Sequence, residues 1–247
     1  MNEAYGAFAY AYDQALGEMF FQAARRVLGD VLARYPSDER THLDVACGTG
    51  LAVEFFEKHG YQSVGVDASL AMLAVGRKRA VRLIGGDFRA LPFRTTFGRI
   101  TSLYDSLNHI ERREDLVAVF RSIRGLMSPR SLFLFDMNHP DVYPAVWGMH
   151  EPYVSTGRDH HLEIATKFRA RDGIAHGLVT GWARLTNGEQ VKIRETHRQR
   201  AWSEAEITEC LGEAGLGALE VIDFDPFQDV TNLDTGGVKL FFVCRAT

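Results

Sequence analysis

The spacing of apolar residues changes along the chain, and each change indicates a different kind of structure. Over the first 35 residues, apolar side chains recur every three or four positions, which is typical of helices. From residue 42 to residue 136, short apolar runs alternate with longer stretches of helical periodicity. Between residues 151 and 201, apolar and polar positions alternate, which is typical of strands with one buried face. We therefore expect an N-terminal helical segment, an α/β segment and a set of antiparallel strands.

The α/β segment is expected to form a parallel sheet. Its strands are continuous apolar runs separated by helices, and strands of this kind are buried on both faces. Ser128-Pro129-Arg130 is expected to turn the chain into the last of these strands. A helix that begins at Ser203 and two further apolar runs would complete the sheet. The expected strands are 42–46, 63–67, 81–84, 100–104, 132–136, 219–222 and 238–243, and the expected helices are 51–58, 69–79, 112–127 and 203–212.

The alternating residues interrupt the α/β pattern as a small insertion. Asp172-Gly173 and Asn187-Gly188 are turn sequences that join hairpin strands. Residues 151–202 contain nine Lys and Arg against six Asp and Glu, a local charge of +3 in a chain of net charge −4. This charge could favour an anionic acceptor, and the solvated face of a small sheet is the alternative explanation. The expected strands of the insertion are 162–168, 174–182 and one beginning at 191.

Length and composition are those of one large domain with a modest insertion. The chain has 247 residues, of which 46% are hydrophobic and 24% are charged. No apolar run approaches the roughly 20 residues that cross a bilayer, and the first residues lack the basic start and apolar core of a signal peptide. Cys47, Cys210 and Cys244 lie far apart, which predicts reduced thiols and no zinc site. We expect a cytoplasmic protein without a metal ion and without a nucleic-acid or membrane partner.

A turn with two glycines follows the first expected strand and is the most informative part of the sequence. Gly48 and Gly50 let a ligand approach the backbone, and the helix that follows offers free N–H donors. Asp67 ends the second strand, where a carboxylate can accept hydrogen bonds from two ribose hydroxyls. Asp87 and Phe88 follow the third strand, where they can bind an amine and cover an adenine face. Because ligands bind at the carboxyl ends of adjacent parallel strands, these groups predict a nucleotide-like ligand.

Two kinds of nucleotide ligand compete for this turn. A dinucleotide site has a third small residue after the two glycines, and Val53 stands at that position. The turn and the two segments that follow the next strands instead resemble the successive motifs of the class I S-adenosylmethionine-dependent methyltransferases. The resemblance covers about residues 40–140 and extends to the two closing strands. The motifs are Asp44-x-Ala46-x-Gly48-Thr49-Gly50, Val64-Gly65-Val66-Asp67-Ala68-Ser69-x-x-Met72-Leu73 and Gly86-Asp87-Phe88.

This resemblance implies a fold, a cofactor and a set of binding residues. The fold is a Rossmann-like, doubly wound, mostly parallel seven-stranded sheet with an antiparallel closing strand, plus the small antiparallel β insertion. The cofactor is S-adenosylmethionine, with S-adenosylhomocysteine as its product. In the family pattern, the glycines border the methionine part, Asp67 holds the ribose, and Asp87 with Phe88 binds the adenine. The residues implied to bind the cofactor are Tyr12, Asp44, Ala46, Gly48, Gly50, Asp67, Ala68, Met72, Asp87, Phe88 and Tyr104.

Four further segments resemble a bacterial small-molecule branch of this family, in which an N-terminal helix covers the cofactor. They are the aromatic stretch from Tyr5 to Asp13 and the stretches 104–109, 135–138 and 197–202. Some members of that branch methylate the amine of nucleotide-linked sugars. The resemblance places Tyr104 and His109 beside the methyl group as catalytic candidates, with His109 as the general base by its intrinsic pKa. The alternatives are a helix-capping or surface histidine at His109 and an ordinary packed aromatic residue at Tyr12.

We therefore expect three parts: an N-terminal helical lid (1–40), a cofactor-binding α/β domain (41–140 and 203–247) and an antiparallel cap over the acceptor site (141–202). The predicted function is transfer of a methyl group to nitrogen or oxygen of a small molecule by in-line displacement. The alternatives are an NAD(P)-dependent oxidoreductase and a non-catalytic S-adenosylmethionine-binding protein. The acceptor and the oligomeric state stay open, with a homodimer as one candidate.

Overall fold

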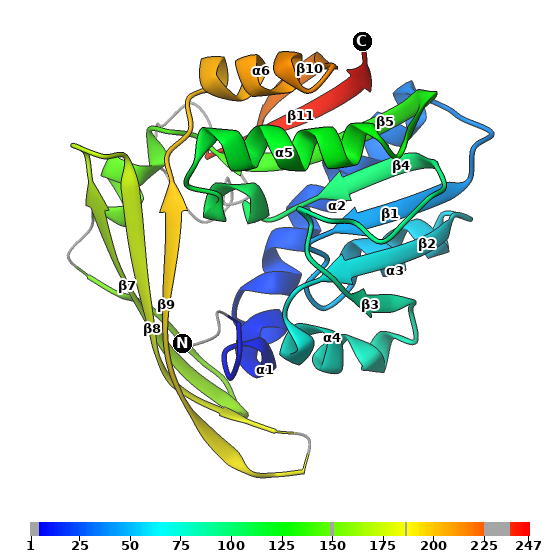
Figure 1. The fold of residues 1–247 in the computed structure, drawn as a ribbon. Coiled ribbons are helices and arrows are strands. Elements are labelled where there is room, and N and C mark those ends of the chain that lie inside the picture. Colours follow the sequence, from blue (N-terminus) through cyan, green and yellow to red (C-terminus); the bar gives the residue numbers. More distant parts are fainter. Residues whose placement is uncertain (1–4, 149–150, 186, 225–237) are drawn as a thin grey trace.

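The computed structural model describes residues 5–148, 151–185, 187–224 and 238–247, which form two β-sheets with helices around them (Figure 1). The larger sheet has seven strands in the order β10-β11-β5-β4-β1-β2-β3. Strands β1 to β5 are parallel, and β11 is antiparallel to both of its neighbours. The order confirms the doubly wound sheet with an antiparallel closing strand. Its strands are β1 (Thr41–Val45), β2 (Gln62–Asp67), β3 (Leu83–Gly85), β4 (Phe97–Ser102), β5 (Met127–Asn138), β10 (Leu216–Phe224) and β11 (Lys239–Ala246).

Helices cover both faces of this sheet because its strands are apolar on both sides. In β5, Phe133 and Phe135 join the apolar layer under α5 and α6, whereas Leu132 and Leu134 join the layer under α2 and α3 (Figure 1). Successive side chains of a strand point to opposite faces, so one apolar run supplies both layers. Among the described residues, no helix has the length and apolar character needed to cross a lipid bilayer. The helices are α1 (Ala9–Tyr12), α2 (Glu18–Arg34), α3 (Leu51–Lys58), α4 (Leu70–Gly76), α5 (Arg113–Arg124) and α6 (Glu204–Glu213).

Two segments differ from their expected form. The N-terminal helical stretches are continuous, because Asp13–Gly17 continues the helix as a wider π-helical turn instead of ending it. Strand β5 begins at Met127 rather than at Leu132, and its register against β4 shifts between these two residues. The expected turn at residues 128–130 is therefore an irregularity inside the strand. The Ser131 hydroxyl stabilises it by accepting the backbone N–H of Ser128 (2.8 Å).

The second sheet is the small antiparallel insertion, and it has one strand more than the sequence predicted. Its order is β6-β7-β8-β9, with every neighbouring pair antiparallel. One face packs on the N-terminal helix, where Phe8 and Ala11 form an apolar cluster with Leu162, Val179 and Ile193. The helix is thus held between the two sheets (Figure 1). Buried and exposed residues alternate along β9. The strands are β6 (Tyr153–Thr156), β7 (His160–Arg169), β8 (Ile174–Arg184) and β9 (Gln190–Arg200).

A chain of buried polar groups crosses the centre of the large sheet. His42 of β1 binds Ser63 of β2 through Nδ1 (2.5 Å) and Thr101 of β4 through Nε2 (2.9 Å), and its ring stacks on Phe56. Thr101 donates its hydroxyl hydrogen to the Asp44 carboxylate, so its oxygen accepts from His42 Nε2–H. Burial holds the pKa of His42 well below its usual range. Burial also raises the pKa of Asp44 to about 7.

Replacing Asp44 by asparagine should raise the melting temperature at alkaline pH and leave it nearly unchanged in acid. The folded protein keeps the Asp44 proton up to about pH 7, whereas the unfolded chain releases it near pH 4. This group therefore favours folding fully below about pH 4, and its contribution is lost as the pH rises to about 7. Asparagine, which does not titrate, removes the dependence.

Thermal unfolding of wild type and Asp44→Asn at about pH 4, 6 and 8 measures the effect. Asp38→Asn is the control, because Asp38 is exposed. The difference in melting temperature between variant and wild type should grow with pH for Asp44 and stay flat for Asp38. A difference for Asp44 that is the same at every pH would contradict the assignment.

Candidate functional site

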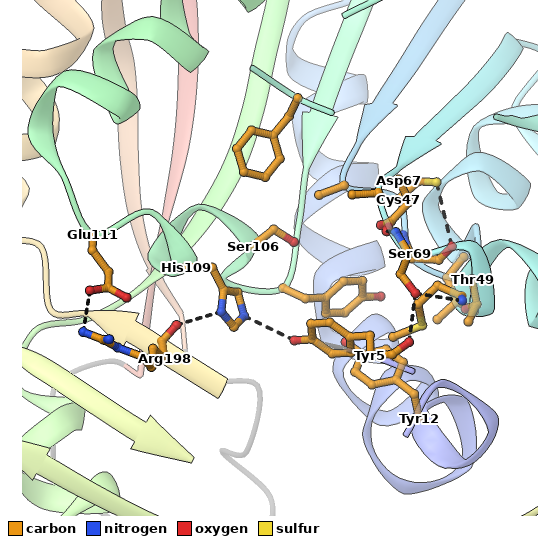
Figure 2. Close-up of a pocket in the computed structure, with 17 residues that line it drawn as sticks. Tyr5, Tyr12, Cys47, Thr49, Asp67, Ser69, Ser106, His109, Glu111 and Arg198 are labelled. Atoms are coloured by element: carbon orange, nitrogen blue, oxygen red, sulfur yellow. Dashed lines mark hydrogen bonds and ion pairs between the residues drawn. The ribbon is translucent and has the colours of Figure 1, made fainter. Parts of the chain in front are cut away.

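A cavity of about 370 Å³ lies at the carboxyl ends of β1, β2 and β4. The turns that follow these strands form one wall, and Tyr5 and Tyr12 of the N-terminal segment lie across from it (Figure 2). Glu111 and Arg198 lie at one end of the cavity, where the cap strand β9 meets the large sheet. The cavity occupies the place that the sequence predicted, because the carboxyl ends of adjacent parallel strands meet at one edge of a sheet.

The glycine turn leaves its backbone open to the cavity. Ala46, Gly48 and Gly50 have φ angles of 57°, 54° and 84°, a region that favours glycine. A Cβ atom at Gly48 would meet nothing within 4 Å, so this glycine leaves room for a ligand beside the backbone. At Gly50, a Cβ atom would lie 3.0 Å from the side chain of Leu83. Gly50 is therefore favoured by its left-handed backbone and by its close packing against β3.

Asp67 ends β2 and presents a half-satisfied carboxylate to the cavity. Its Oδ2 accepts the Gly48 backbone N–H (2.7 Å), and its Oδ1 accepts the Ser69 backbone N–H (2.7 Å). Each oxygen keeps a second lone pair, so the carboxylate can accept two more hydrogen bonds from a ligand. Burial raises the pKa of Asp67, and the two backbone N–H groups oppose that rise. This geometry suits a pair of neighbouring hydroxyls.

The N-terminal helix is fastened to the glycine turn by Asp13, which is 3% exposed. Its carboxylate accepts hydrogen bonds from the Thr49 hydroxyl (2.5 Å) and from the Arg79 guanidinium (2.7 Å). Burial opposes ionisation of Asp13, but the Thr49 hydrogen bond and the positive charges around it hold its pKa below the usual range. The Ser69 hydroxyl also donates to the backbone oxygen of Tyr5 (2.8 Å). These contacts close the helix over the cavity.

The segment after β4 forms the remaining wall. Tyr104 has a buried hydroxyl without a hydrogen-bond partner in the described part of the chain. His109 ends the short 3₁₀ helix Ser106–His109 and binds the Arg198 carbonyl oxygen through Nδ1 (2.8 Å) and the Tyr5 hydroxyl through Nε2 (3.2 Å) (Figure 2). A carbonyl oxygen only accepts, so Nδ1 carries the hydrogen and Nε2 accepts from Tyr5. Burial lowers the pKa of His109 and so favours the neutral imidazole.

The structure brings most of the predicted site residues to this cavity. Three do not line it: Asp44 faces the buried polar chain, Gly50 packs against β3, and the carboxylate of Asp87 is held by the guanidinium of Arg89. The predicted residues that line the cavity are Tyr12, Ala46, Gly48, Asp67, Ala68, Met72, Phe88, Tyr104 and His109.

Some residues of the wall were not among the predicted binding residues. Tyr5 belongs to the aromatic N-terminal pattern, and Ser69 has the position of a helix N-cap, so both carried a signal in the sequence. Glu111 and Arg198 carried none, because their approach depends on how β9 docks beside the loop that follows β4. The others are Cys47, Thr49, Leu51 and Ser106.

The wall fits a ligand with a nucleoside part. Gly48 leaves its backbone open, Asp67 keeps free acceptor positions, and the Tyr104 hydroxyl needs a partner. Met72 and Phe88 add apolar surface that suits an adenine. Within the described ranges, no group of three or more His, Cys, Asp or Glu side chains is placed to hold a metal ion.

Known proteins with similar sequences and folds are methyltransferases. Residues 43–130 match a family model described as a methyltransferase domain. The chain is 30% identical over 202 residues to the cypemycin N-terminal methyltransferase of Streptomyces sp, which covers 79% of this chain and 78% of that protein. Its fold is similar to that of an S-adenosylmethionine-dependent methyltransferase from Clostridium acetobutylicum ATCC 824, with a TM-score of 0.78, 21% identity and 99% of both chains covered. It is also similar to S-adenosylmethionine-bound CalS10, an amino pentose methyltransferase from Micromonospora echinaspora, with a TM-score of 0.72, 19% identity and 100% and 99% of the two chains covered.

These likenesses and the cavity agree on S-adenosylmethionine as the cofactor. They do not favour an NAD(P)-dependent oxidoreductase or a binding protein without catalysis. The chain belongs to the class I S-adenosylmethionine-dependent methyltransferases, in the bacterial branch that acts on small molecules.

Proposed function

We propose that this enzyme transfers the methyl group to the nitrogen of a small-molecule amine. The choice of nitrogen over oxygen rests on the state of the bases around the cavity. A hydroxyl acceptor must give its proton to a base as it attacks, but the Tyr5 hydroxyl lies between His109 Nε2 and the acceptor, and Glu111 is paired with Arg198 (2.7 Å). A neutral amine attacks through its own lone pair and needs no base for that step.

Two relatives support an amine acceptor. By their names, the cypemycin enzyme methylates a peptide N-terminus and CalS10 methylates an amino pentose. We propose an amine of one of these two classes, on a sugar or at the start of a peptide. The cap, residues 141–202, is proposed to hold the rest of the acceptor molecule.

Bound S-adenosylmethionine supplies a methyl group on a positively charged sulfur. We propose that the backbone at Gly48 borders its methionine part and that the two free acceptor positions of Asp67 take the ribose hydroxyls. Ala68, Met72 and Phe88 line the part of the wall proposed for the adenine. Tyr5 and the helix behind it would keep water out, which strengthens every electrostatic contact inside.

The roles proposed for Tyr104 and His109 concern the acceptor. The oxygen of the unpaired Tyr104 hydroxyl can accept a hydrogen bond from an N–H of the acceptor amine. This contact would orient the lone pair of the nitrogen toward the methyl group. When the new N–C bond forms and the S–C bond breaks, the nitrogen is left with a surplus proton. Tyr5 can accept that proton while its own hydroxyl hydrogen passes to His109 Nε2, along the hydrogen bond that joins them.

The reaction type is tested by incubating the protein with S-adenosylmethionine and paired acceptors. Each pair has an amine and its hydroxyl analogue: an amino sugar nucleotide against the sugar nucleotide, and a peptide with a free N-terminus against its hydroxy-acid counterpart. Mass spectrometry should detect the gain of one methyl group on an amine and none on the hydroxyl analogues. Methylation of a hydroxyl analogue alone would contradict the proposal, as would failure of S-adenosylmethionine to bind in isothermal titration.

Asp67→Ala should weaken binding of S-adenosylhomocysteine by about 1–3 kcal/mol, because it removes hydrogen bonds to a charged acceptor. Isothermal titration gives the dissociation constants of variant and wild type. Asp67→Asn keeps one acceptor oxygen and should fall between them. A melting curve of each variant checks that the Gly48 turn still folds without its carboxylate partner. Unchanged affinity in a folded Asp67→Ala protein would remove Asp67 from the ribose role.

His109→Gln should lower kcat on the amine acceptor by about 10²-fold, a typical effect of losing a proton-transfer group. The dissociation constant of S-adenosylhomocysteine should stay at the wild-type value, because His109 is assigned to the acceptor side. His59→Gln is the matched control, since His59 is exposed at the end of α3. Equal kcat values in His109→Gln and wild type would exclude the proposed route for the proton.

A further inference from the structure

The wall beside the methyl-transfer end depends on a strained turn. Tyr104 and Asp105 follow β4 with φ angles of 62° and 48°, so two consecutive residues with side chains adopt the left-handed conformation. Such residues persist only where the surrounding structure fixes them, and they occur often at functional sites. This turn sets the direction of the Tyr104 side chain and begins the short helix that ends at His109.

One buried carboxylate holds both peptide groups of the turn. Asp136 of β5 accepts the backbone N–H of Tyr104 through Oδ1 (2.6 Å) and that of Asp105 through Oδ2 (3.0 Å). Its side chain is 3% exposed. A buried carboxylate needs a positive partner, because the loss of hydration strongly disfavours a lone charge. The turn therefore depends on the Asp136 side chain and on the partner that keeps it in place.

Lys239 provides that partner. It is the first residue of β11, and its ammonium lies 2.7 Å from Asp136 Oδ2 and 2.6 Å from Asp105 Oδ1. Burial opposes its charge, but Asp105 and Asp136 together raise the pKa of Lys239 above its usual value. Gln199 of the cap strand β9 donates to the second oxygen of Asp105. Strands β5, β9 and β11 and the turn after β4 thus meet around this ion pair.

We propose that Lys239 is a positioning residue for methyl transfer, acting through Asp136 and Asp105 on the turn that aims Tyr104 into the cavity. Lys239 does not line the cavity, and its ammonium binds Asp105 and Asp136, so its effect passes through the backbone of the turn. The inference rests on the proposed function, because it takes Tyr104 and His109 to face the acceptor. The simpler alternative is an ion pair that only stabilises the fold. Removing the lysine alone leaves two carboxylates without their positive partner and lowers stability. The two roles are therefore separated by where amide protection is lost and by whether cofactor affinity is kept.

The test compares Lys239→Met, Lys239→Gln and Lys239→Arg with wild type. Lys58→Met is the control, since Lys58 is exposed at the end of α3 and is not part of the cavity wall. Three quantities are measured on the full chain: amide hydrogen exchange of residues 103–109, the dissociation constant of S-adenosylhomocysteine, and kcat on the amine acceptor. Exchange reports on the Tyr104 and Asp105 amides directly, because Asp136 accepts both of them.

Lys239→Met and Lys239→Gln should lose protection of these two amides and lower kcat by about 10²-fold, the effect expected of a misplaced reacting group. Affinity for S-adenosylhomocysteine should stay at the wild-type value. Lys239→Arg keeps the positive charge and should recover both protection and kcat in part. Lys58→Met should match wild type in all three measurements.

Wild-type exchange in the Met and Gln variants would overturn the proposal. A general loss of stability, with parallel losses of cofactor affinity and kcat, would also overturn it. If Lys239→Met fails to fold, the Gln and Arg variants decide the same question. Exchange and cofactor affinity need no acceptor. They therefore test the role of Lys239 even if no amine is methylated by wild type, an outcome that counts against the proposed function alone.

Discussion

The cavity exists because the carboxylate of Asp13 fastens the N-terminal helix to the glycine turn. Asp13 lies inside a π-helical turn, where it meets Thr49 on one side and the charges of Arg79 and Lys78 on the other. Breaking such a pair leaves an uncompensated buried charge, so the attachment is strongly maintained. The opposite side of the helix packs against the cap through apolar residues, and Glu195 accepts the backbone N–H of Phe8 (2.9 Å). One helix therefore connects the cofactor wall to the sheet proposed to hold the acceptor.

The polar groups of the site gather at one edge of the large sheet. The two layers of aliphatic and aromatic side chains around β5 fix the strands, and the fixed strands position the polar groups at and beyond their carboxyl ends. The carboxylates of Asp67 and Asp136 each accept two backbone N–H groups. The positions of these donors are set by the backbone at the ends of the strands and not by the rotamers of other side chains. A site with this origin is rigid on the cofactor side and depends on the helix and the cap for its remaining walls.

The sequence predicted those features that arise from local chemistry. The apolar runs predicted both sheets, and the order of glycines and aspartates after consecutive strands predicted where the cavity lies. A strand of four residues with an exposed face, β6, is too short for its alternation to stand out. The conformation at Ser128–Arg130 could not be predicted either, because a turn and a strand irregularity use the same residues.

Contacts between residues that are far apart in the sequence could not be predicted from it. Gly50 and Gly48 look alike in the sequence, and only the proximity of Leu83 shows that one serves packing while the other opens the cavity. In the sequence, Lys239 looks like the start of an ordinary closing strand. The two carboxylates that pair with it, Asp136 and Asp105, are 103 and 134 positions away along the chain. The docking of β9 beside His109 depends on the path of the whole insertion. Each of these is a property of the assembled fold.

The alternation along β9 limits how the cap can change in evolution. Glu195, His197 and Gln199 are buried against the N-terminal segment and the turn after β4. Thr196 and Arg198 between them are exposed, and Arg198 reaches the end of the cavity. Because the side-chain period of a strand is two, inserting or deleting one residue within β9 would exchange the two sets and turn the exposed residues inward. Substitutions keep the register and change one contact at a time. Variation in acceptor preference among relatives of this enzyme should therefore be found as substitutions along β9, with changes of length confined to the hairpin ends.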